Sequence, residues 1–199
     1  IQVPPASPGR PANPLGQSLS TTLGLIADTH VPDRRRDLHP RVLPIFREAG
    51  VSTILHAGDI AVPRVLTELA QVAPVTAVRG NRDWVVRLPY HRTLTVEDVR
   101  IGLTHGHGSW GQYGRDKLRF LLRGPQTFEY FMRRAISLVG DVDVVVFGHN
   151  HEPMVKDVDG RLVVNPGSAC CQMLPGKPPS VALLHIDGDK ASAEIVNLD

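Results

Sequence analysis

The sequence predicts a mixed α/β protein in which two mixed β-sheets pack together with helices on the outside. In the first half of the chain, apolar segments of strand length alternate with helical patterns, which indicates parallel strand pairing. In the second half, strand-like segments follow one another across short turns, which indicates antiparallel hairpins. The 199 residues suffice for one domain with a substantial core, and the 42% apolar and 21% charged content is typical of a globular protein.

The folded domain is expected to begin after a proline-rich segment. Residues 1–21 carry too few large apolar side chains to offset the entropy lost on ordering, so we expect a disordered tail. Residues 22–199 are expected to form a single domain, and no internal repeat divides them. Its first element is a strand over 22–27, followed by Asp28-Thr29-His30.

Helical and strand patterns alternate up to residue 78. Pro44 fits the first predicted helix only near the first turn, because an interior proline clashes with the preceding turn and cannot donate a backbone hydrogen bond. Pro63 suits a helix start for the same reason. In order, the predicted elements are a helix over 40–49, a strand over 53–57, a helix over 63–72 and a strand over 75–78.

Hairpins and a helical pair are predicted for the rest of the chain. Asp159-Gly160 is a strong turn dipeptide between two strand patterns, and Gly124-Pro125 interrupts a helical region. In order, the predicted elements are strands over 92–96 and 99–104, two helices within 112–139, and strands over 142–147, 154–158, 161–164, 181–186 and 191–196.

Five of the predicted strands are followed by residues that can bind a metal ion. Each motif is weak by itself, since an isolated Gly-Asp or Asp-x-His usually belongs to a turn. Their joint occurrence is specific, because the carboxyl ends of neighbouring strands would meet at one edge of a sheet. The strand ends are Asp28-x-His30, Gly58-Asp59, Gly80-Asn81, His105 and His149-x-His151.

The residue types in this set indicate two metal ions. His149 and His151 would project from the same side of an extended backbone, and neutral imidazole is a common metal ligand. Carboxylate, amide and imidazole donors together exceed what one ion needs, and they suit Mn, Fe, Zn, Ni or Co better than Ca or a structural zinc. Two such ions about 3.5–4 Å apart can activate a water and stabilise a phosphoryl oxygen.

The same motifs resemble those of the calcineurin-like metallophosphoesterases, and most of all their small bacterial and archaeal phosphodiesterase branch. The resemblance covers about residues 22–197 and implies a four-layer αββα sandwich. It implies that Asp28, His30 and His151 hold one metal ion, that Asn81, His105 and His149 hold the other, and that Asp59 bridges them. The motifs that carry it are Asp28-x-His30, Gly58-Asp59, Gly80-Asn81-x-Asp83, Thr104-His105-Gly106-His107, Gly148-His149-x-His151 and Asn165-Pro166-Gly167-Ser168.

The function implied by this resemblance is hydrolysis of phosphodiester bonds through a metal-bridging hydroxide, with two divalent transition-metal ions as cofactors and manganese as the first choice. The nearest alternative is a phosphomonoesterase that uses the same site. A non-catalytic protein-binding scaffold, as in the eukaryotic retromer subunit of this fold, is less favoured because every ligand position is filled. A DNA-processing nuclease is disfavoured, because the net charge is only +2 and there is no room for a DNA-binding domain.

Four residues are expected to take part in catalysis: Asp28, Asn81, Arg82 and His107. Arg82 departs from the phosphoprotein-phosphatase branch, where a histidine in this position serves as a proton donor. Arginine stays protonated and cannot act as a general acid, so Arg82 is expected to bind a phosphoryl oxygen. His107 is expected to contact the substrate or to protonate the leaving group.

Other residues have simpler interpretations. His56 is expected to be a core histidine, Asp83 to orient its turn or touch substrate, and Arg34–Arg36 to lie on a solvated surface. The helical insertion at 108–139 leaves and returns to the metal edge, so it is expected to form one wall of the substrate pocket.

The expected partner is a small phosphoester, with no stable nucleic-acid complex and no membrane, and with a homo-oligomer left open. Cys170 and Cys171 are adjacent and cannot join distant segments, so we expect a reducing, cytoplasmic setting.

Overall fold

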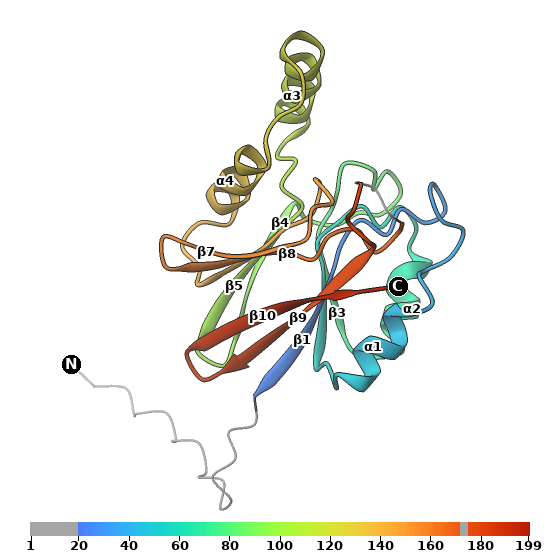
Figure 1. Ribbon diagram of the computed structural model, residues 1–199, viewed down its shortest axis with the longest axis vertical. Coiled ribbons are helices and arrows are strands. Elements are labelled where there is room, and N and C mark those ends of the chain that lie inside the picture. The colour runs from blue at the N-terminus through green and yellow to red at the C-terminus, as the bar shows by residue number, and fades with distance from the viewer. Residues whose placement is uncertain (1–19, 172–174) are drawn as a thin grey trace, which may run out of the picture.

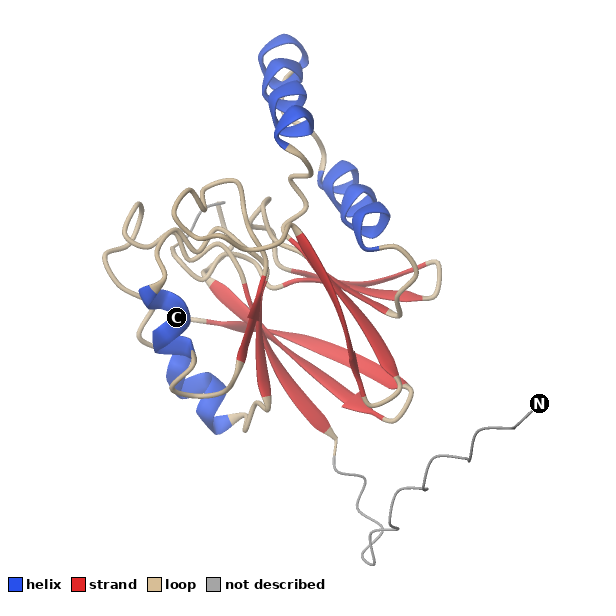
Figure 2. Cartoon of the chain, turned by 180° about the vertical axis from the view of Figure 1, so that it is seen from behind, coloured by secondary structure: helices blue, strands red, loops and turns tan. Residues whose placement is uncertain are grey.

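Two five-stranded sheets pack face to face in the computed structural model, which describes residues 20–171 and 175–199 (Figures 1 and 2). The strand order is β10-β9-β1-β2-β3 in the first sheet and β4-β5-β6-β8-β7 in the second. Strands β1, β2 and β3 pair in parallel, and so do β5, β6 and β8, while the outer pairs are antiparallel. Both sheets are therefore mixed, as the sequence predicts.

The first sheet combines the early parallel strands with the C-terminal hairpin, and two short helices cover its outer face (Figure 1). Pro44 is the third residue of α1, so it disrupts no hydrogen bond within the helix. The elements are β1 (Thr21–Ile26), α1 (Val42–Glu48), β2 (Thr53–His56), α2 (Arg64–Leu69), β3 (Val75–Ala77), β9 (Ser180–Asp187) and β10 (Lys190–Asn197).

The second sheet is built from two hairpins and a central strand, and a longer helix covers it. Helix α4 packs closely on this sheet, because a Cβ added to Gly102 would lie only 2.5 Å from Cβ of Val139. The elements are β4 (His91–Val96), β5 (Val99–Thr104), α3 (Trp110–Arg123), α4 (Phe128–Val139), β6 (Val144–Val146), β7 (Met154–Val158) and β8 (Arg161–Asn165).

Three apolar clusters separate the four layers. Successive residues of a strand point to opposite faces. Accordingly Ile54 packs toward α1 and α2, whereas Leu55 packs between the sheets. The third cluster joins Met132 and Ala135 of α4 to Val145 and Val163 of the second sheet. Strands buried on both faces require continuous apolar runs, which explains the Val144–Val146 segment.

The predicted elements agree with the structure except at their ends. The structure confirms the αββα architecture, while α2 and β6 are shorter than the sequence predicts. Most of the predicted disordered tail lies outside the described residues. Within the described part, β1 begins at Thr21, one residue inside the segment predicted to be disordered.

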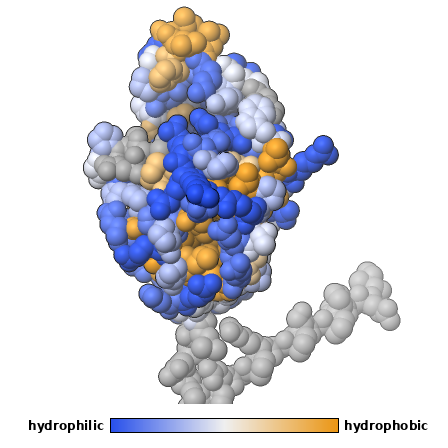
Figure 3. All heavy atoms as spheres, turned by 90° about the vertical axis from the view of Figure 1, so that its right-hand side faces the viewer, coloured by the Kyte–Doolittle hydropathy of each residue, from blue (hydrophilic) through white to orange (hydrophobic). Residues whose placement is uncertain are grey.

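Helix α3 projects from the body of the molecule (Figures 1 and 2). Its exposed leucines include Leu121 and Leu122, which are 78% and 73% exposed, and orange atoms mark its apolar far end at the top of Figure 3. Among the described helices, none combines the length and the apolar character needed to cross a bilayer.

Candidate metal centre

The ligand-bearing loops converge at the carboxyl ends of the parallel strands. The loop after β1 is joined to the loop after β2 by two backbone hydrogen bonds, from the Asp28 amide to the Gly58 carbonyl at 3.0 Å and from the His30 amide to the Asp59 carbonyl at 3.1 Å. The loop after β6 joins them, because the His149 amide donates to Oδ2 of Asp28 at 3.0 Å. The sequence placed these residues 121 positions apart, and the fold brings them into contact.

One group of donor atoms surrounds the Asp28 carboxylate. Nε2 of His151 lies 3.2 Å from Oδ1 of Asp28, and Nε2 of His30 lies 3.7 Å from the same oxygen. The two imidazole nitrogens are 3.3 Å apart. Oδ2 of Asp59 completes the group at 3.8 Å from Nε2 of His30.

A second group surrounds the side-chain oxygen of Asn81. Nδ1 of His149 lies 2.9 Å from Oδ1 of Asn81, and Nε2 of His105 lies 3.1 Å from it. Oδ1 of Asp59 is 3.4 Å from Nε2 of His105. The two carboxylate oxygens of Asp59 therefore face different groups, which is the arrangement of a bridging ligand.

Both groups fit transition-metal ions. Nitrogen and oxygen ligands bound at about 2.0–2.2 Å lie about 2.8–3.6 Å from one another in tetrahedral or octahedral coordination. The measured separations of 2.9–3.8 Å fall in or just above that range. In addition, Oδ1 of Asp28 is buried and accepts no hydrogen bond from any described residue. A buried carboxylate oxygen without a donor is costly unless a cation neutralises it.

The backbone at five of the seven candidate ligands is left-handed, a conformation uncommon for residues other than glycine. The φ angles are 53° at Asp28, 46° at His30, 55° at Asp59, 78° at His149 and 59° at His151. This corrects the expectation that His149 and His151 share an extended backbone. Each such residue costs of order 1–3 kcal/mol and persists only where the surroundings impose it, and such positions cluster at functional sites.

Asp83 and Gly80 hold the loops that carry Asp59 and Asn81. The buried Asp83 carboxylate accepts hydrogen bonds from the backbone amides of Gly80 at 2.7 Å, Ala61 at 2.7 Å and Asp59 at 3.1 Å. A side chain at Gly80 would overlap Asp59. Of the two roles open from the sequence, the structure supports turn orientation for Asp83.

Electrostatics favour positive charge in the centre. Burial alone would raise the pKa of Asp28, but the neighbouring His151 and His105 imidazoles outweigh it and hold this pKa below its usual value. Burial alone would lower the pKa of His105, but the Asp59 and Asp28 carboxylates raise it to about 9. The two carboxylates therefore favour a positive charge at this position. Nδ1 of His105 contacts the Ala57 carbonyl at 2.7 Å, which leaves Nε2 directed at the centre.

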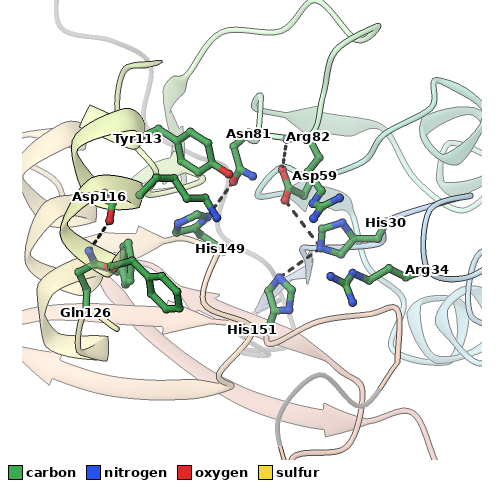
Figure 4. Close-up of a pocket in the computed structure, with 13 residues that line it drawn as sticks. His30, Arg34, Asp59, Asn81, Arg82, Tyr113, Asp116, Gln126, His149 and His151 are labelled. Carbon is green, nitrogen blue, oxygen red and sulfur yellow. Dashed lines mark hydrogen bonds and ion pairs between the residues drawn. The ribbon is translucent and has the colours of Figure 1, made fainter. Parts of the chain in front are cut away.

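A cavity of about 240 Å³ opens over the two groups (Figure 4). Arg34 and Arg82 line it on one side, next to His30. The Arg82 guanidinium is partly exposed and lies 3.4 Å from the Asp33 carboxylate. Arg34 is exposed, as the sequence predicts, and it also lines the cavity.

The helical insertion forms the opposite side of the cavity, as its position between two ligand-bearing strands predicts (Figure 4). Aromatic side chains of both helices of the insertion take part. The lining residues of the insertion are Tyr113, Asp116, Lys117, Phe120, Gln126 and Phe131.

His107 and His56 are both buried but lie outside this cavity's lining. His107 lines a separate cavity with Tyr90, and its ring centroid lies 5.3 Å from that of His105, so the expected contact with substrate stays a prediction. Burial lowers the pKa of His107 to about 3, and the imidazole is neutral. His56 is the expected core histidine, with Nδ1 accepting from the Gly58 amide at 3.2 Å and Nε2 3.3 Å from the Thr29 hydroxyl.

Residues 22–189 match the family model of the calcineurin-like phosphoesterase superfamily domain. The chain belongs to this superfamily. It is 37% identical to a protein of Methanothermobacter thermautotrophicus named "Probable metallophosphoesterase", over 87% of this chain and 91% of that protein. It is 28% identical to a phosphodiesterase of Methanocaldococcus jannaschii, over 78% of this chain and 88% of the relative.

The fold also matches solved structures of the superfamily. Vps29 of Chaetomium thermophilum superposes with a TM-score of 0.66 at 21% sequence identity, over 88% of this chain and 95% of Vps29. At this identity the match establishes the shared sandwich and carries no information about activity. Membership of a phosphoesterase family and the candidate ligand cluster identify this chain as a metallophosphoesterase-family hydrolase.

Proposed function

We propose that this protein is a phosphodiesterase with two divalent metal ions in its active site. The observation that carries the proposal is the position of Asp59, whose Oδ2 faces His30 at 3.8 Å and whose Oδ1 faces His105 at 3.4 Å. One carboxylate shared between two groups of donors fits a dinuclear centre better than a single ion. The relative named as a phosphodiesterase supports the choice of reaction.

The proposed ligands divide between two positions. Asp28, His30 and His151 would hold one ion, Asn81, His105 and His149 would hold the other, and Asp59 would bridge them. The donors are oxygens and imidazole nitrogens without thiolate, which suits Mn, Fe, Zn, Ni or Co. Manganese stays our first choice among them, as the family resemblance implies. Bound ions of this kind supply Lewis-acid activation of water and neutralise charge on the phosphoryl group.

The protein's own residues would orient the substrate. Arg82 extends into the cavity with a permanently charged guanidinium, so it can donate hydrogen bonds to a phosphoryl oxygen. It cannot supply a proton to a leaving group, and His107 is outside the cavity's lining. We therefore propose substrates whose leaving groups need little protonation, and we assign no general acid.

The test is hydrolysis of bis(p-nitrophenyl) phosphate by the full chain, with Mn²⁺ and with chelator. We expect Mn²⁺-dependent release of p-nitrophenolate, and loss of at least about 100-fold in kcat/KM for Asn81→Ala and His149→Ala. His185→Ala is the matched control, because His185 lies on β9 and contacts Thr22 and Glu194, far from the cavity. A metal-loaded protein that hydrolysed neither this diester nor p-nitrophenyl phosphate would refute the proposal.

A phosphomonoesterase that uses the same centre is the alternative reaction. Comparing p-nitrophenyl phosphate with the diester in one assay decides between them by the ratio of kcat/KM values. A protein-binding scaffold is a weaker alternative, supported by the shared fold with Vps29 of Chaetomium thermophilum and by 27% sequence identity to vacuolar protein sorting-associated protein 29 of Schizosaccharomyces pombe. The free thiols of Cys170 and Cys171, with sulfur atoms 3.3 Å apart, suit the reducing cytoplasm that we propose as the location.

A further inference from the structure

The helical insertion brings aromatic rings to the edge of the candidate metal centre. We use the term helical wall for Tyr113, Lys117 and Phe120 of α3, Gln126 of the turn, and Phe131 of α4. The Phe131 ring lies 4.9 Å from the His149 ring, centroid to centroid, in an edge-on arrangement. The Tyr113 ring is 6.4 Å from the same histidine. A group attached to a phosphoryl at the centre would therefore meet aromatic side chains on this side.

The rings are held there by a polar network between the two helices. The buried Asp116 carboxylate accepts hydrogen bonds from the Tyr130 hydroxyl at 2.7 Å and from Nη2 of Arg134 at 3.1 Å. The Gln126 amide donates to the backbone carbonyl of Asp116 at 2.8 Å, which fixes the turn against α3. Nη1 of Arg134 donates to the His107 carbonyl at 3.3 Å, which joins the insertion to the loop after β5.

Because of this network, the rings of the helical wall are already in position before a ligand binds. Rings already fixed against the centre lose little freedom when a ligand binds, so their contact with a planar group is more favourable. Aromatic rings prefer offset or edge-on contacts with other planar rings, and every nucleobase or aryl group offers such a face. Lys117, with Nζ 5.4 Å from the Tyr113 ring centroid, adds a cation beside these rings.

The two sides of the cavity differ in chemistry, which orients the substrate. Arg34 and Arg82 provide positive charge beside His30, whereas the helical wall provides aromatic surface beside His149 (Figure 4). The cavity of about 240 Å³ is smaller than the roughly 300–1,000 Å³ typical for drug-sized ligands. It therefore has room for a phosphoryl group with one planar ring system.

We propose that the helical wall is a binding site for the planar aromatic group of a compact phosphodiester, aryl or nucleoside. This inference rests on the proposed phosphodiesterase activity and specifies its substrate class. The phosphoryl oxygens face the metal centre and Arg82, and the ring that stays on phosphorus packs against Phe120, Phe131 and Tyr113.

The test compares three substrates that share the p-nitrophenolate leaving group and differ in the group that stays on phosphorus. These are methyl p-nitrophenyl phosphate, phenyl p-nitrophenyl phosphate and the p-nitrophenyl ester of thymidine 5′-phosphate, each assayed with the Mn²⁺-loaded full chain. We expect kcat/KM for the phenyl or thymidine substrate to exceed that for the methyl substrate by about tenfold or more. The phenyl and thymidine assays also distinguish an aryl from a nucleoside source of the ring.

Variants of the helical wall test whether its aromatic side chains cause the preference for the phenyl substrate. Phe120→Ala and Phe131→Leu should lower the phenyl-to-methyl ratio toward one. Leu121→Ala should keep the wild-type ratio, since Leu121 is a neighbour on α3 that does not line the cavity. Because the ratio is measured within each variant, loss of folded protein does not affect it.

The outcomes separate the two proposals. Equal efficiency toward all three diesters, or a ratio that Phe120→Ala and Phe131→Leu leave unchanged, would overturn the helical-wall inference alone. Failure of the metal-loaded wild type to hydrolyse any of the three would overturn the phosphodiesterase proposal and the inference with it.

Discussion

Nε2 of His30 and Nε2 of His151 lie 3.3 Å apart, although 121 residues separate them in the chain. Both nitrogens also face Oδ1 of Asp28, which accepts no hydrogen bond from the described residues. Two imidazole nitrogens and a carboxylate oxygen directed at one point form a candidate cation position. Only Asn150 separates His149 from His151 in the chain. His149 nevertheless belongs to the other group, with Asn81 and His105. The two histidines of this short motif therefore point to separate positions.

His151→Ala is expected to remove metal from the Asp28/His30 position first, because that position loses one of its three terminal ligands and the other position loses none. The total metal content should fall to about one ion per chain, measured by mass spectrometry of the Mn²⁺-loaded protein. Anomalous scattering from crystals of the variant would show which position is depleted. His149→Ala is the reciprocal variant and should deplete the Asn81/His105 position. Equal loss at both positions in both variants would contradict the division of ligands.

Chelation is expected to lower the thermal stability of the protein. A ligand that binds only the folded state at 100 times its Kd stabilises that state by about 2.7 kcal/mol. For a chain of this size, that corresponds to a fall in Tm of roughly 5–10 °C when EDTA removes the ions. Calorimetry with EDTA, and then with excess Mn²⁺, measures the loss and its recovery. A wild-type Tm that is the same in both conditions would argue against a bound metal, and His30→Ala, which lacks a proposed ligand, should show a smaller chelator effect.

Arg82→Ala is expected to reduce kcat/KM for bis(p-nitrophenyl) phosphate by about tenfold or more, because a charge-assisted hydrogen bond to the phosphoryl group contributes about 1.5–3 kcal/mol. Arg82→Lys should recover part of this loss, since lysine keeps the charge but not the planar guanidinium. Steady-state kinetics of both variants measure the effect. Arg87→Ala provides the control, because Arg87 is an exposed arginine nearby that does not line the cavity. Equal kinetics for Arg82→Ala and Arg87→Ala would remove Arg82 from the proposed site.

Asp83→Asn is expected to destabilise the fold by about 2–4 kcal/mol, although asparagine has nearly the same shape. The carboxylate accepts from three backbone amides, and the asparagine NH₂ group would face at least one of those donors. The Tm should fall by roughly 5–10 °C in calorimetry. Asp98→Asn, an exposed position in the β4–β5 turn, should change the Tm by less than about 2 °C. A Tm for Asp83→Asn that matches this control would mean that the three hydrogen bonds do not hold the loops.

Arg134→Met is expected to destabilise the protein by about 3 kcal/mol, because it leaves the buried Asp116 carboxylate without its cation. Arg133→Met, the neighbouring substitution, removes an exposed pair with Glu129 that contributes only about 0.3–0.5 kcal/mol. Urea denaturation of both variants measures the difference. Comparable stability of the two variants would show that the Asp116–Arg134 pair does not fix the helical insertion.

The sequence predicted the fold well because its patterns are local. An apolar run such as Val144–Val146 indicates a strand that is buried on both faces. The dipeptides Asp159-Gly160 and Gly124-Pro125 indicate turns, and a turn depends only on neighbouring residues. The set of candidate metal ligands was predictable for a related reason, since each of them lies in the loop that follows a strand. Parallel pairing brings together the ends of β1, β2 and β3 in one sheet and those of β5 and β6 in the other, and the packing of the two sheets joins the two sets.

Tertiary placement was harder to predict. His107 has the same alternation with His105 as a second ligand would have, but the turn at Gly106 directs it to another cavity. Arg34 and Tyr113 face the centre because of how their loop and helix pack, which no local pattern reports. The left-handed backbone at His149 and His151 also has no signal in the sequence, because histidine does not mark that conformation as glycine does.

The left-handed backbone of five candidate ligands affects which substitutions the centre would tolerate. These residues are Asp28, His30, Asp59, His149 and His151. Glycine occupies this backbone region without strain, so replacing a ligand by glycine removes both an unfavourable conformation and a buried polar group. At His30 and His151 such a replacement would relieve backbone strain, whereas at Asp28 and Asp59 it would also leave the amides of His149 and Arg82 without their acceptors. The histidine loops therefore carry a conformational cost that the same sandwich would not carry if it bound no metal, and the two sheets do not depend on it.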